Sequence, residues 1–301
     1  MTNAQSHELQ AAETRVLICP AIGGAIARFS FRGSEILRRA SDAAIADRLV
    51  RQMASYPLVP YSNRIGNGKL VVGKESFSLR PNFAPEPHAI HGFGWQREWQ
   101  VGSRSATSLE LSLAHSPDAD WPFSCEARQQ FSLAGDALSV ALTVRNTDTR
   151  AMPAGLGFHP YFTLAPGLHL QTEWQSMWKM GEDKLPLGRV PVPADADFSL
   201  LRPVEGWKID HCFSGWKRHA LLDYPTHRVV LTASEPCNNI VVYAPNDGRG
   251  FIAMEPVSNT NNAFAMAAGG VADTGTRMLA PGDAFAVTMT IAVSSTRPAR
   301  G

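Results

Sequence analysis

The fold class is decided by three neighbouring stretches of alternating sequence: SLELSLAHS (residues 108–116), EARQQFSLAG (126–135) and ALSVALTVRNT (137–147). In each stretch apolar and polar residues alternate with a period of two, which is typical of a β-strand with one buried face. Gly135-Asp136 lies between the second and third stretches and indicates a turn. This part of the chain therefore predicts consecutive antiparallel strands.

The same pattern extends outward in both directions. Short apolar runs cut by turn residues predict further strands, for example at 15–19, 25–31, 35–38, 69–79, 220–243 and 279–295. Only the segment 43–53 has helical spacing, because Ile45, Leu49 and Met53 recur every four residues. We therefore predict an all-β fold, a large antiparallel β-sandwich of some twenty short strands with one short helical segment.

The domain organisation follows from composition. Residues 1–13 are polar and are predicted to be a disordered tail. No composition shift, repeat or low-complexity linker divides the rest, so residues 14–296 are predicted to form a single domain. The 301 residues are 44% hydrophobic and 18% charged, which is ordinary for a soluble globular protein with a large core.

The net charge and the cysteines indicate which partners and which cellular compartment the protein has. The net charge is +1 and the longest basic block is the pair Arg38-Arg39, which argues against a nucleic-acid partner. The N-terminal residues lack the apolar core of a signal peptide, and no apolar run reaches the roughly 18 residues that span a bilayer. Four separated cysteines without a C-x-x-C pair are typical of buried, reduced thiols in a cytoplasmic protein, although the sequence leaves a disulfide open.

The first candidate for a functional residue is the histidine in the stretch GLGFHPYF, residues 155–162. Pro160 lacks a backbone donor, so His159 is predicted to lie at the end or edge of a strand. The aromatic residues around it offer the flat apolar surface on which sugar rings stack. Considered alone, His159 is equally well explained as a structural histidine that bonds to a backbone carbonyl.

Two earlier segments carry further candidates. Asn63-Arg64, among prolines and before the turn GNG, offers donors for hydroxyls or a carboxylate, although a surface arginine on a turn is the commoner case. His88 and His91 form an H-x-x-H pair in a Pro/Gly-rich segment that argues against a helix. Since residues i and i+3 of a strand point to opposite faces, we do not expect both to bind one metal, and His91, flanked by glycines, is the better candidate for a pocket.

Two carboxylates follow in apolar surroundings. Asp210 lies between Ile209 and the Cys212-Phe213 pair, where it either caps a turn or accepts hydrogen bonds from ligand hydroxyls. Glu255 ends the apolar strand FIAM and precedes Pro256. Partial burial there would raise its pKa, as a general base working near neutrality requires, but a structural role in binding the following amides fits the residues as well.

The chain lacks several common catalytic motifs. It has no serine nucleophile elbow, phosphate loop, dinucleotide fingerprint or Cys/His zinc spacing. Acid–base chemistry by a carboxylate and a histidine, without a cofactor, is what remains.

Five segments in order resemble motifs of the aldose 1-epimerase (galactose mutarotase) family: PYSNRIGNGKL, HAIHGFGWQREW, GLGFHPYF, IDHCFSGW and MEPVSNTNNAF. They extend from residue 60 to 264. The resemblance implies a galactose mutarotase-like β-supersandwich with a site on its concave face. It also implies an isomerase that needs no metal or cofactor and interconverts the α and β anomers of a free monosaccharide.

By motif position, the resemblance implies that His159 is the general acid and Glu255 the general base. Asn63, Arg64, His91 and Asp210 match sugar-binding positions. Three alternatives stay open: a non-catalytic sugar-binding or regulatory protein on the same fold, a sugar-phosphate mutarotase, and a glycosidase that would use Asp210 with Glu255. A monomer and a homodimer are both compatible with the sequence.

Overall fold

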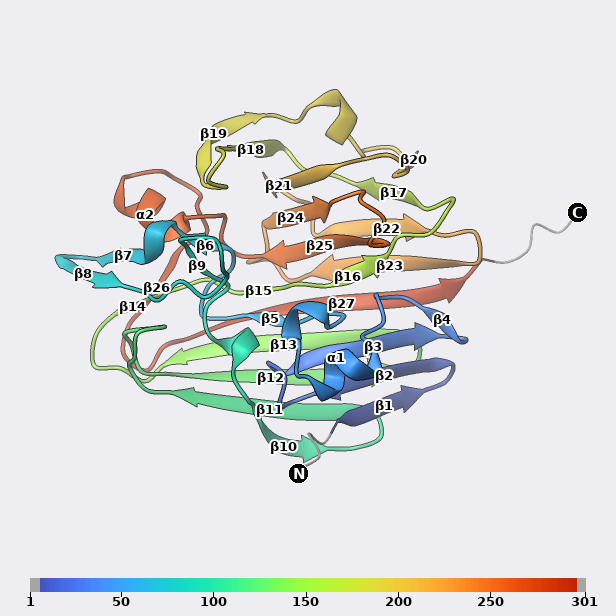
Figure 1. The fold of residues 1–301 in the computed structure, drawn as a ribbon, viewed down its shortest axis with the longest axis horizontal. Helices are drawn as coiled ribbons and strands as arrows, with labels where there is room; N and C mark the ends of the chain where they lie inside the picture. Colours follow the sequence, from blue (N-terminus) through green and yellow to red (C-terminus); the bar gives the residue numbers. More distant parts are fainter. Residues whose placement is uncertain (1–5, 297–301) are drawn as a thin grey trace, which may run out of the picture.

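The computed structural model describes residues 6–296. It consists mostly of antiparallel strands gathered into two large sheets and four smaller ones (Figure 1). Only two short α-helices accompany them in the part of the chain that is described. The predicted all-β class is confirmed, and the sequence stretches at 108–147 form three neighbouring strands of the larger sheet.

The first large sheet has nine strands. Its longest ladder joins β12 to β13, where Gln129 faces Leu142 and Phe131 faces Val140. Alternate residues of these strands are buried, as the period of two requires. In spatial order the strands are β10 Gln100–Arg104, β11 Ser108–His115, β12 Cys125–Ala134, β13 Ala137–Asn146, β27 Ala284–Ser295, β23 His227–Ala233, β22 His219–Asp223, β17 His169–Thr172 and β20 Arg202–Pro203.

The second large sheet has eight strands, and it carries the chemistry-bearing segments. Its central strand, β25 (Phe251–Val257), is buried at every position. A strand buried along its whole length must have both faces of its sheet covered. The other strands, in order, are β19 Pro186–Pro191, β18 Ser176–Met180, β21 Ile209–Ser214 and β24 Asn239–Ala244 on one side of β25, then β15 Gly157–Phe158, β5 Pro57–Leu58 and β16 Tyr161–Thr163 on the other.

Smaller elements surround these sheets. A four-stranded N-terminal sheet comprises β1 His7–Ala11, β2 Thr14–Cys19, β3 Ala25–Phe31 and β4 Ser34–Glu35. Three two-stranded sheets pair β6 Arg64–Ile65 with β9 Ala89–Ile90, β7 Lys69–Val72 with β8 Glu75–Ser78, and β14 Met152–Ala154 with β26 Arg277–Leu279. The helices are α1 Asp42–Ala46 and α2 Ala263–Ala268, with 3₁₀ turns at Val50–Gln52, Gly66–Gly68, Gly94–Gln96 and Ala194–Ala196.

The N-terminal expectation was wrong for the residues that are described. Residues 7–11, predicted to be disordered, form β1 and pair with β2. Leu9, 1% exposed, anchors this strand in the core, and Gln10 N–H donates to the carbonyl of Ala106. Most side chains of an edge strand are exposed and therefore polar. The sequence of such a strand can thus look like that of a polar tail. Residues 1–5 lie outside the described residues.

The helical prediction needs two corrections. The helix predicted within 43–53 ends at Ala46, because Arg48 adopts a left-handed conformation with φ 53°. Leu49 is consequently exposed, while Met53 is buried after a separate 3₁₀ turn. A second helix, α2, was not predicted. Its sequence AFAMAA follows the asparagine-rich segment and has no polar face from which a helical period could be read.

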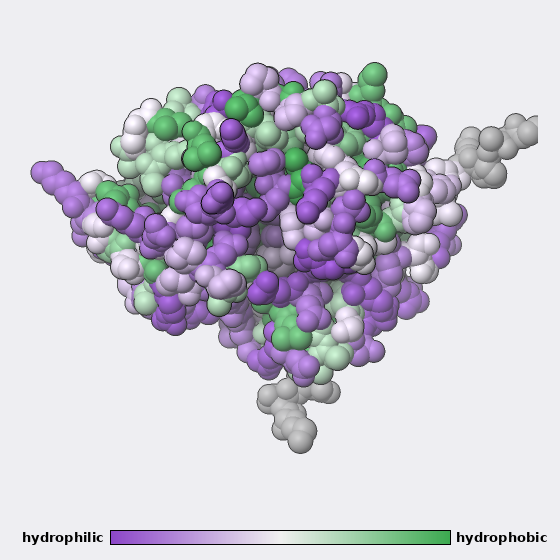
Figure 2. Space-filling model, turned by 45° about the horizontal axis from the view of Figure 1, so that its top comes forward, coloured by the Kyte–Doolittle hydropathy of each residue, from purple (hydrophilic) through white to green (hydrophobic). Residues whose placement is uncertain are grey.

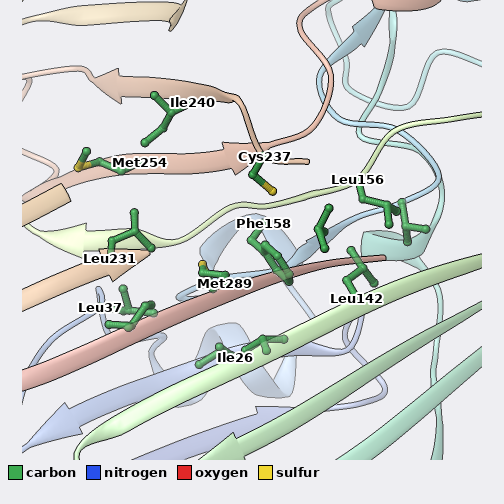
Figure 3. Packing of buried hydrophobic residues seen from close by; sticks show 14 of the residues in the cluster. Ile26, Leu37, Leu142, Leu156, Phe158, Leu231, Cys237, Ile240, Met254 and Met289 are labelled. Atoms are coloured by element: carbon green, nitrogen blue, oxygen red, sulfur yellow. The ribbon is translucent and has the colours of Figure 1, made fainter. Parts of the chain in front are cut away.

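The hydrophobic core fills the space between the two large sheets (Figure 3). Met254 of β25 and Ile240 of β24 contribute to it from one sheet, and Leu142 and Met289 contribute from the other. Phe158 of β15 belongs to the same cluster and is 2% exposed. Since successive side chains of a strand point to opposite faces, the core position of Phe158 turns His159 to the other face of the eight-stranded sheet.

A second buried cluster covers that other face. It joins Ala25 and Ala27 of β3 and Met53 to Phe251 and Ala253 of β25. These residues alternate with the core residues of β25, so the sheet is apolar on both faces. The candidate residues described below lie on this second face, in a polar interruption of the cluster.

The exposed surface shows no dominant apolar area on the face in Figure 2, where hydrophilic residues cover most of the middle and hydrophobic ones are scattered. Large exposed hydrophobic side chains come from separate elements, for example Leu49, Val101, Leu200 and Met278. Scattered residues of this kind are normal for a folded chain. Among the helices of residues 6–296, none has the length and apolarity to cross a membrane.

Candidate active site

A polar cavity of about 270 Å³ lies on the second face of the eight-stranded sheet. Its size is close to the lower end of ligand pockets, roughly 300 Å³, and suits a small ligand. All six residues singled out from the sequence line it: Asn63, Arg64, His91, His159, Asp210 and Glu255. The structure therefore brings together residues that are up to 192 positions apart, the separation of Asn63 and Glu255 (255 − 63).

The sheet side of the cavity is built by alternation along adjacent strands. On β25, Met254 points into the core between the sheets, whereas Phe251 and Glu255 line the cavity. Glu255 pairs in register with Val241 of β24, and Asp210 of β21 pairs with Tyr243 of the same strand. One row of side chains thus projects from each strand into the same space.

His159 and Glu255 form a direct contact at the base of the cavity. The Nε2 atom of His159 lies 3.2 Å from Oε1 of Glu255, and the two residues are 6% and 3% exposed. Nδ1 of His159 and Oε2 of Glu255 are buried without a hydrogen-bond partner among residues 6–296. Buried polar atoms of this kind are costly unless a ligand or a reaction uses them.

Two tyrosines hold the histidine ring. Tyr161 stacks on His159 with centroids 4.4 Å apart, and Tyr56 packs on it at 4.6 Å. The tyrosine hydroxyls bond to each other at 2.9 Å, and the backbone N–H of His159 donates to the carbonyl of Tyr56. The imidazole is therefore held by packing on both faces, and its Nε2 lies near Oε1 of Glu255 and, at 3.4 Å, near the hydroxyl of Tyr161.

Burial shifts the two titrating groups in opposite directions. The pKa of Glu255 is raised well above its usual value, first by burial and then by the charge of Asp210, while Arg64 opposes the shift. The pKa of His159 is lowered well below its usual value by burial, with further lowering by His91 and Arg38. Both shifts favour uncharged forms, so the pair is expected to hold one proton between its two members.

The raised pKa of Glu255 predicts a pH-dependent effect on stability. A carboxyl whose folded pKa is raised contributes stability that is fully present below its usual pKa of 4.5 and is lost as the pH rises through the folded pKa. Glu255→Gln removes this titration. Melting curves of both proteins between pH 4 and 8 should show the melting temperature of the variant rising relative to the wild type as the pH increases.

Glu98→Gln is the control for this experiment, since the Glu98 side chain is 62% exposed. A melting-temperature difference between Glu255→Gln and the wild type that stays constant over the whole range would contradict a raised pKa.

The opposite wall is built by two loops that bond to each other at Asn63 and His91. The backbone N–H of Asn63 donates to Nδ1 of His91 at 3.0 Å, and the backbone N–H of His91 donates to the carbonyl of Asn63 at 2.9 Å. Both residues have left-handed backbones, with φ 59° and 63°. Backbones of this kind persist where surrounding contacts impose them, often at functional sites. His91 lines the cavity.

The hydrogen bond from Asn63 decides the tautomer of His91. Because Nδ1 accepts a proton donor, the neutral ring carries its own proton on Nε2. Burial, with the charge of Arg64, lowers the pKa of His91 to about 3, so the ring is neutral. His91 therefore offers an N–H donor to whatever occupies the cavity.

His91, His159 and Glu255 each place one ligand atom within 4.8 Å of the others, a grouping that could hold a metal ion. Coordination through Nε2 of His91 would require its proton to move to Nδ1, which would remove the acceptor for Asn63. The hydrogen-bonding pattern thus favours a ligand hydroxyl over a cation at this position.

His88 has a different role from His91. Its Nδ1 accepts from the backbone N–H of Asn67 at 2.9 Å, and its Nε2 donates to the carbonyl of Asp183 at 2.8 Å. Both ring nitrogens are thus used between loops, and His88 does not line the cavity. The two histidines of the H-x-x-H pair do not share a site.

Arg64 is held by a carboxylate that the sequence interpretation missed. Its Nε and one Nη donate to both oxygens of Glu86 at 2.7 and 2.8 Å, and the other Nη donates to Oδ1 of Asn63 at 3.1 Å. Such a two-point contact fixes the plane of the guanidinium. The only sequence signal was an acidic residue between two prolines, Pro85 and Pro87, and nothing in the sequence linked it to Arg64.

Asp210 lies at the mouth of the cavity. Its side chain is 40% exposed and is 3.4 Å from Nζ of Lys184, which is itself half-exposed. Asp210 is therefore neither a turn cap nor a buried charge. It is a rim acceptor, available to a ligand hydroxyl on the solvent side.

Comparison with known proteins identifies the family. A sequence profile described as Aldose 1-epimerase matches residues 5–292. The chain belongs to the aldose 1-epimerase family. Among curated proteins, the uncharacterized Escherichia coli K12 protein YphB is 29% identical over 281 residues, which are 90% of this chain and 93% of YphB.

Solved structures show how widely the family fold is shared. An E. coli K12 protein provisionally called an aldose 1-epimerase superposes with a TM-score of 0.88 at 24% identity, covering 97% of this chain and 99% of the other. Galactose 1-epimerase from Lactobacillus acidophilus NCFM superposes with a TM-score of 0.80 at 18% identity, covering 99% and 97%. The galactose mutarotase-like fold of this aldose 1-epimerase family member is thereby confirmed.

Proposed function

We propose that this protein is an aldose 1-epimerase, a mutarotase that interconverts the α and β anomers of an aldose by acid–base catalysis. The observation that carries the proposal is the buried contact of 3.2 Å between Nε2 of His159 and Oε1 of Glu255 in a cavity sized for a monosaccharide. A protein that only binds sugars has no need of this pair, whose burial is costly.

The reaction transfers two protons in opposite directions. The Glu255 carboxylate takes the proton of the C1 hydroxyl while the protonated Nε2 of His159 gives its proton to the ring oxygen. The bond between C1 and the ring oxygen breaks, and C1 becomes an aldehyde. Rotation about the C1–C2 bond then presents the other face of the aldehyde to the new hydroxyl.

Ring closure reverses each transfer. His159 takes the proton from the attacking hydroxyl, and Glu255 returns a proton to the C1 oxygen. The pair begins as imidazolium and carboxylate, passes through imidazole and carboxylic acid, and returns to its first state. One shared proton therefore suffices, and no net charge enters or leaves the buried site.

The opposite shifts of the two pKa values support this scheme. Burial disfavours both charged forms, so it stabilises the imidazole and the carboxylic acid that the pair forms on ring opening. Each positioned proton transfer is worth roughly 10²–10⁴ in rate.

The opposite wall supplies the donors that hold the sugar. The Nε2–H of His91 and the guanidinium of Arg64 face the cavity next to the reacting pair. They can bond to hydroxyls and to the oxygen on which charge develops. Asp210 at the rim accepts from a hydroxyl on the solvent side.

The experiment that tests the proposal is polarimetry on freshly dissolved α-D-glucose and α-D-galactose, extended to other aldoses. We expect the approach to anomeric equilibrium to be faster than in buffer. Acceleration that survives unchanged in the double variant His159→Ala, Glu255→Gln would overturn the assignment, as would the absence of acceleration for every neutral or anionic aldose.

Removal of metal is expected to leave the rate unchanged, because the tautomer of His91 opposes cation binding. The measurement compares anomerisation rates before and after dialysis against EDTA, and again after addition of Zn²⁺. Loss of activity in EDTA that Zn²⁺ restores would show that His91, His159 and Glu255 hold a metal.

Substitution of Glu86 is expected to affect binding more than turnover. Glu86→Ala frees the Arg64 guanidinium from its two-point contact, so we expect KM to rise about tenfold while kcat changes little. Glu98→Ala removes an exposed carboxylate outside the cavity and serves as the control. A fall in kcat at unchanged KM would place Glu86 in the chemical step instead.

A further inference from the structure

The cations around the cavity are unequally neutralised. Five basic side chains line it: Arg38, Arg51, Arg64, Lys184 and Arg249. The last three each contact a carboxylate, namely Glu86, Asp210 and Asp247. Within residues 6–296, no acidic side chain lies within ion-pair distance of Arg38 or Arg51, whereas most other arginines of the chain have such a partner.

Arg38 is held in place by neutral groups. Its Nε and one Nη donate to the carbonyl of Met53 at 3.0 and 2.8 Å, and the same Nη donates to the carbonyl of Arg51 at 2.5 Å. The guanidinium lies over the ring of Tyr161, 3.4 Å from its centroid. Carbonyls and a ring orient the group but supply no negative charge to balance it.

Arg51 extends the same wall. Its guanidinium lies over the ring of Phe83 at 3.9 Å, and Phe83 also lines the cavity. Its own backbone carbonyl is one of the acceptors that hold Arg38. The half-buried Arg38 and the exposed Arg51 are thus joined through the backbone carbonyl of Arg51, and both side chains line the cavity. We call this pair the arginine wall.

Arg38, the half-buried member of the arginine wall, lies on the histidine side of the reacting pair. Tyr161, over which Arg38 lies, stacks directly on His159. The electrostatic effects agree with this placement. Arg38 contributes to the lowered pKa of His159, whereas the charges that act on the pKa of Glu255 are those of Asp210 and Arg64.

This placement orients the sugar. In the proposed reaction His159 serves the ring oxygen and Glu255 serves the hydroxyl on C1. The ring oxygen is bonded to C1 and C5, so a sugar with C1 toward Glu255 directs C5 and its substituent toward the arginine wall. A neutral hydroxymethyl group there would leave two cationic groups without a counter-ion.

We propose that the substrate of this enzyme is an aldose with an anionic substituent on the C5 side of the ring, bound by Arg38 and Arg51. The inference rests on the proposed epimerase function and specifies its substrate class. Carboxylate, sulfonate and phosphate groups share the oxyanion chemistry that guanidinium groups recognise. Hydrogen bonds to a charged group are strong enough to change kcat/KM by roughly 10–100-fold.

The experiment measures anomer exchange at equilibrium by NMR for three matched sugars: D-galactose, D-galacturonate and D-galactose 6-phosphate, with the glucose series in parallel. We expect at least one anionic sugar to exceed its neutral parent about tenfold or more in kcat/KM. The carboxylate and phosphate arms identify which anion fits. Raising the salt concentration should reduce the advantage of the anionic sugar.

Variants separate anion recognition from catalysis. Arg51→Met removes an exposed side chain and should lower kcat/KM for the anionic sugar about tenfold and for the neutral sugar little. Arg38→Met should lower kcat/KM for the anionic sugar more strongly, with a smaller loss for the neutral sugar because Arg38 also acts on the pKa of His159. Its folding is checked by melting. Arg48→Met is the matched control, because Arg48 is exposed, pairs with Glu98 and does not line the cavity.

The outcomes distinguish this inference from the function on which it rests. Turnover of neutral sugars with no gain for either anion, or equal losses for all sugars in Arg51→Met and Arg38→Met, would overturn the anionic substrate and leave the epimerase intact. If no sugar were turned over, the melting temperature would be measured with 1,5-anhydroglucitol and with its 6-phosphate. Neither compound has an anomeric hydroxyl, so this measurement tests anion binding independently of catalysis. Stabilisation by the phosphate alone, lost in Arg51→Met, supports it, and equal or absent shifts overturn it.

Discussion

Replacing Glu255 by Gln is expected to lower the rate of anomer interconversion by about 10³-fold while the protein stays folded. Gln has the shape of Glu but cannot take the proton of the C1 hydroxyl. Glu255 is 3% exposed, and one of its oxygens has no hydrogen-bond partner in the described part of the chain, so the substitution removes a buried titratable group without opening a cavity. The measurement is NMR exchange or polarimetry at saturating sugar, together with thermal melting.

His159→Ala is expected to be similarly inactive, because the ring oxygen then lacks its proton donor. If the two residues act on one shared proton, the double variant should be little slower than either single variant. Losses that multiply would indicate that the residues act independently. Full activity in Glu255→Gln with an unchanged melting transition would remove Glu255 from the mechanism.

Gly92→Ala is expected to destabilise the protein by about 3 kcal/mol or more and to disturb the site. Gly92 has φ +67°, and a Cβ there would lie 2.1 Å from the backbone carbonyl oxygen of Val59. The clash is with backbone, so the loop that carries His91 must shift. Thermal melting should show a decrease of at least about 5 °C, and KM should rise because His91 and Asn63 bond to each other.

Gly73→Ala is the matched control for this effect. Gly73 has a similar φ of +60°, but a Cβ there would meet nothing within 4 Å. It should cost only the roughly 1–2 kcal/mol of a left-handed alanine and leave activity unchanged. Equal losses of stability in both variants would show that backbone conformation, and not the contact with Val59, dominates at Gly92.

Much of the fold was predictable because the alternation that marks a strand is visible within a short stretch of sequence. The period-two stretches at 108–147 became β11, β12 and β13, and the sequence around Gly73 became the hairpin of β7 and β8. The two wrong predictions of secondary structure also concern short segments. β1 is an edge strand with one buried anchor, Leu9, and the helix within 43–53 was cut short by the left-handed Arg48.

The site was predictable in its residues but not in its interactions. His159 and Glu255 were recognisable as candidates from their positions at strand ends and from family motifs. Their contact depends on the pairing of β16 with β25, which no local pattern contains. Glu86 was missed for the same reason, since its role appears only where two loops meet.

The sequence by itself determined the all-β class, the family and the six residues at the cavity, because side-chain alternation and motif order are properties of the linear chain. The tertiary structure decided which groups meet and in what charge state. Burial in contact with distant residues shifts the pKa values of His159 and Glu255 in opposite directions. Long-range packing likewise gives Arg64 a carboxylate partner and gives Arg38 only carbonyl partners and aromatic rings within residues 6–296, since desolvation and charge pairing depend on neighbours in space.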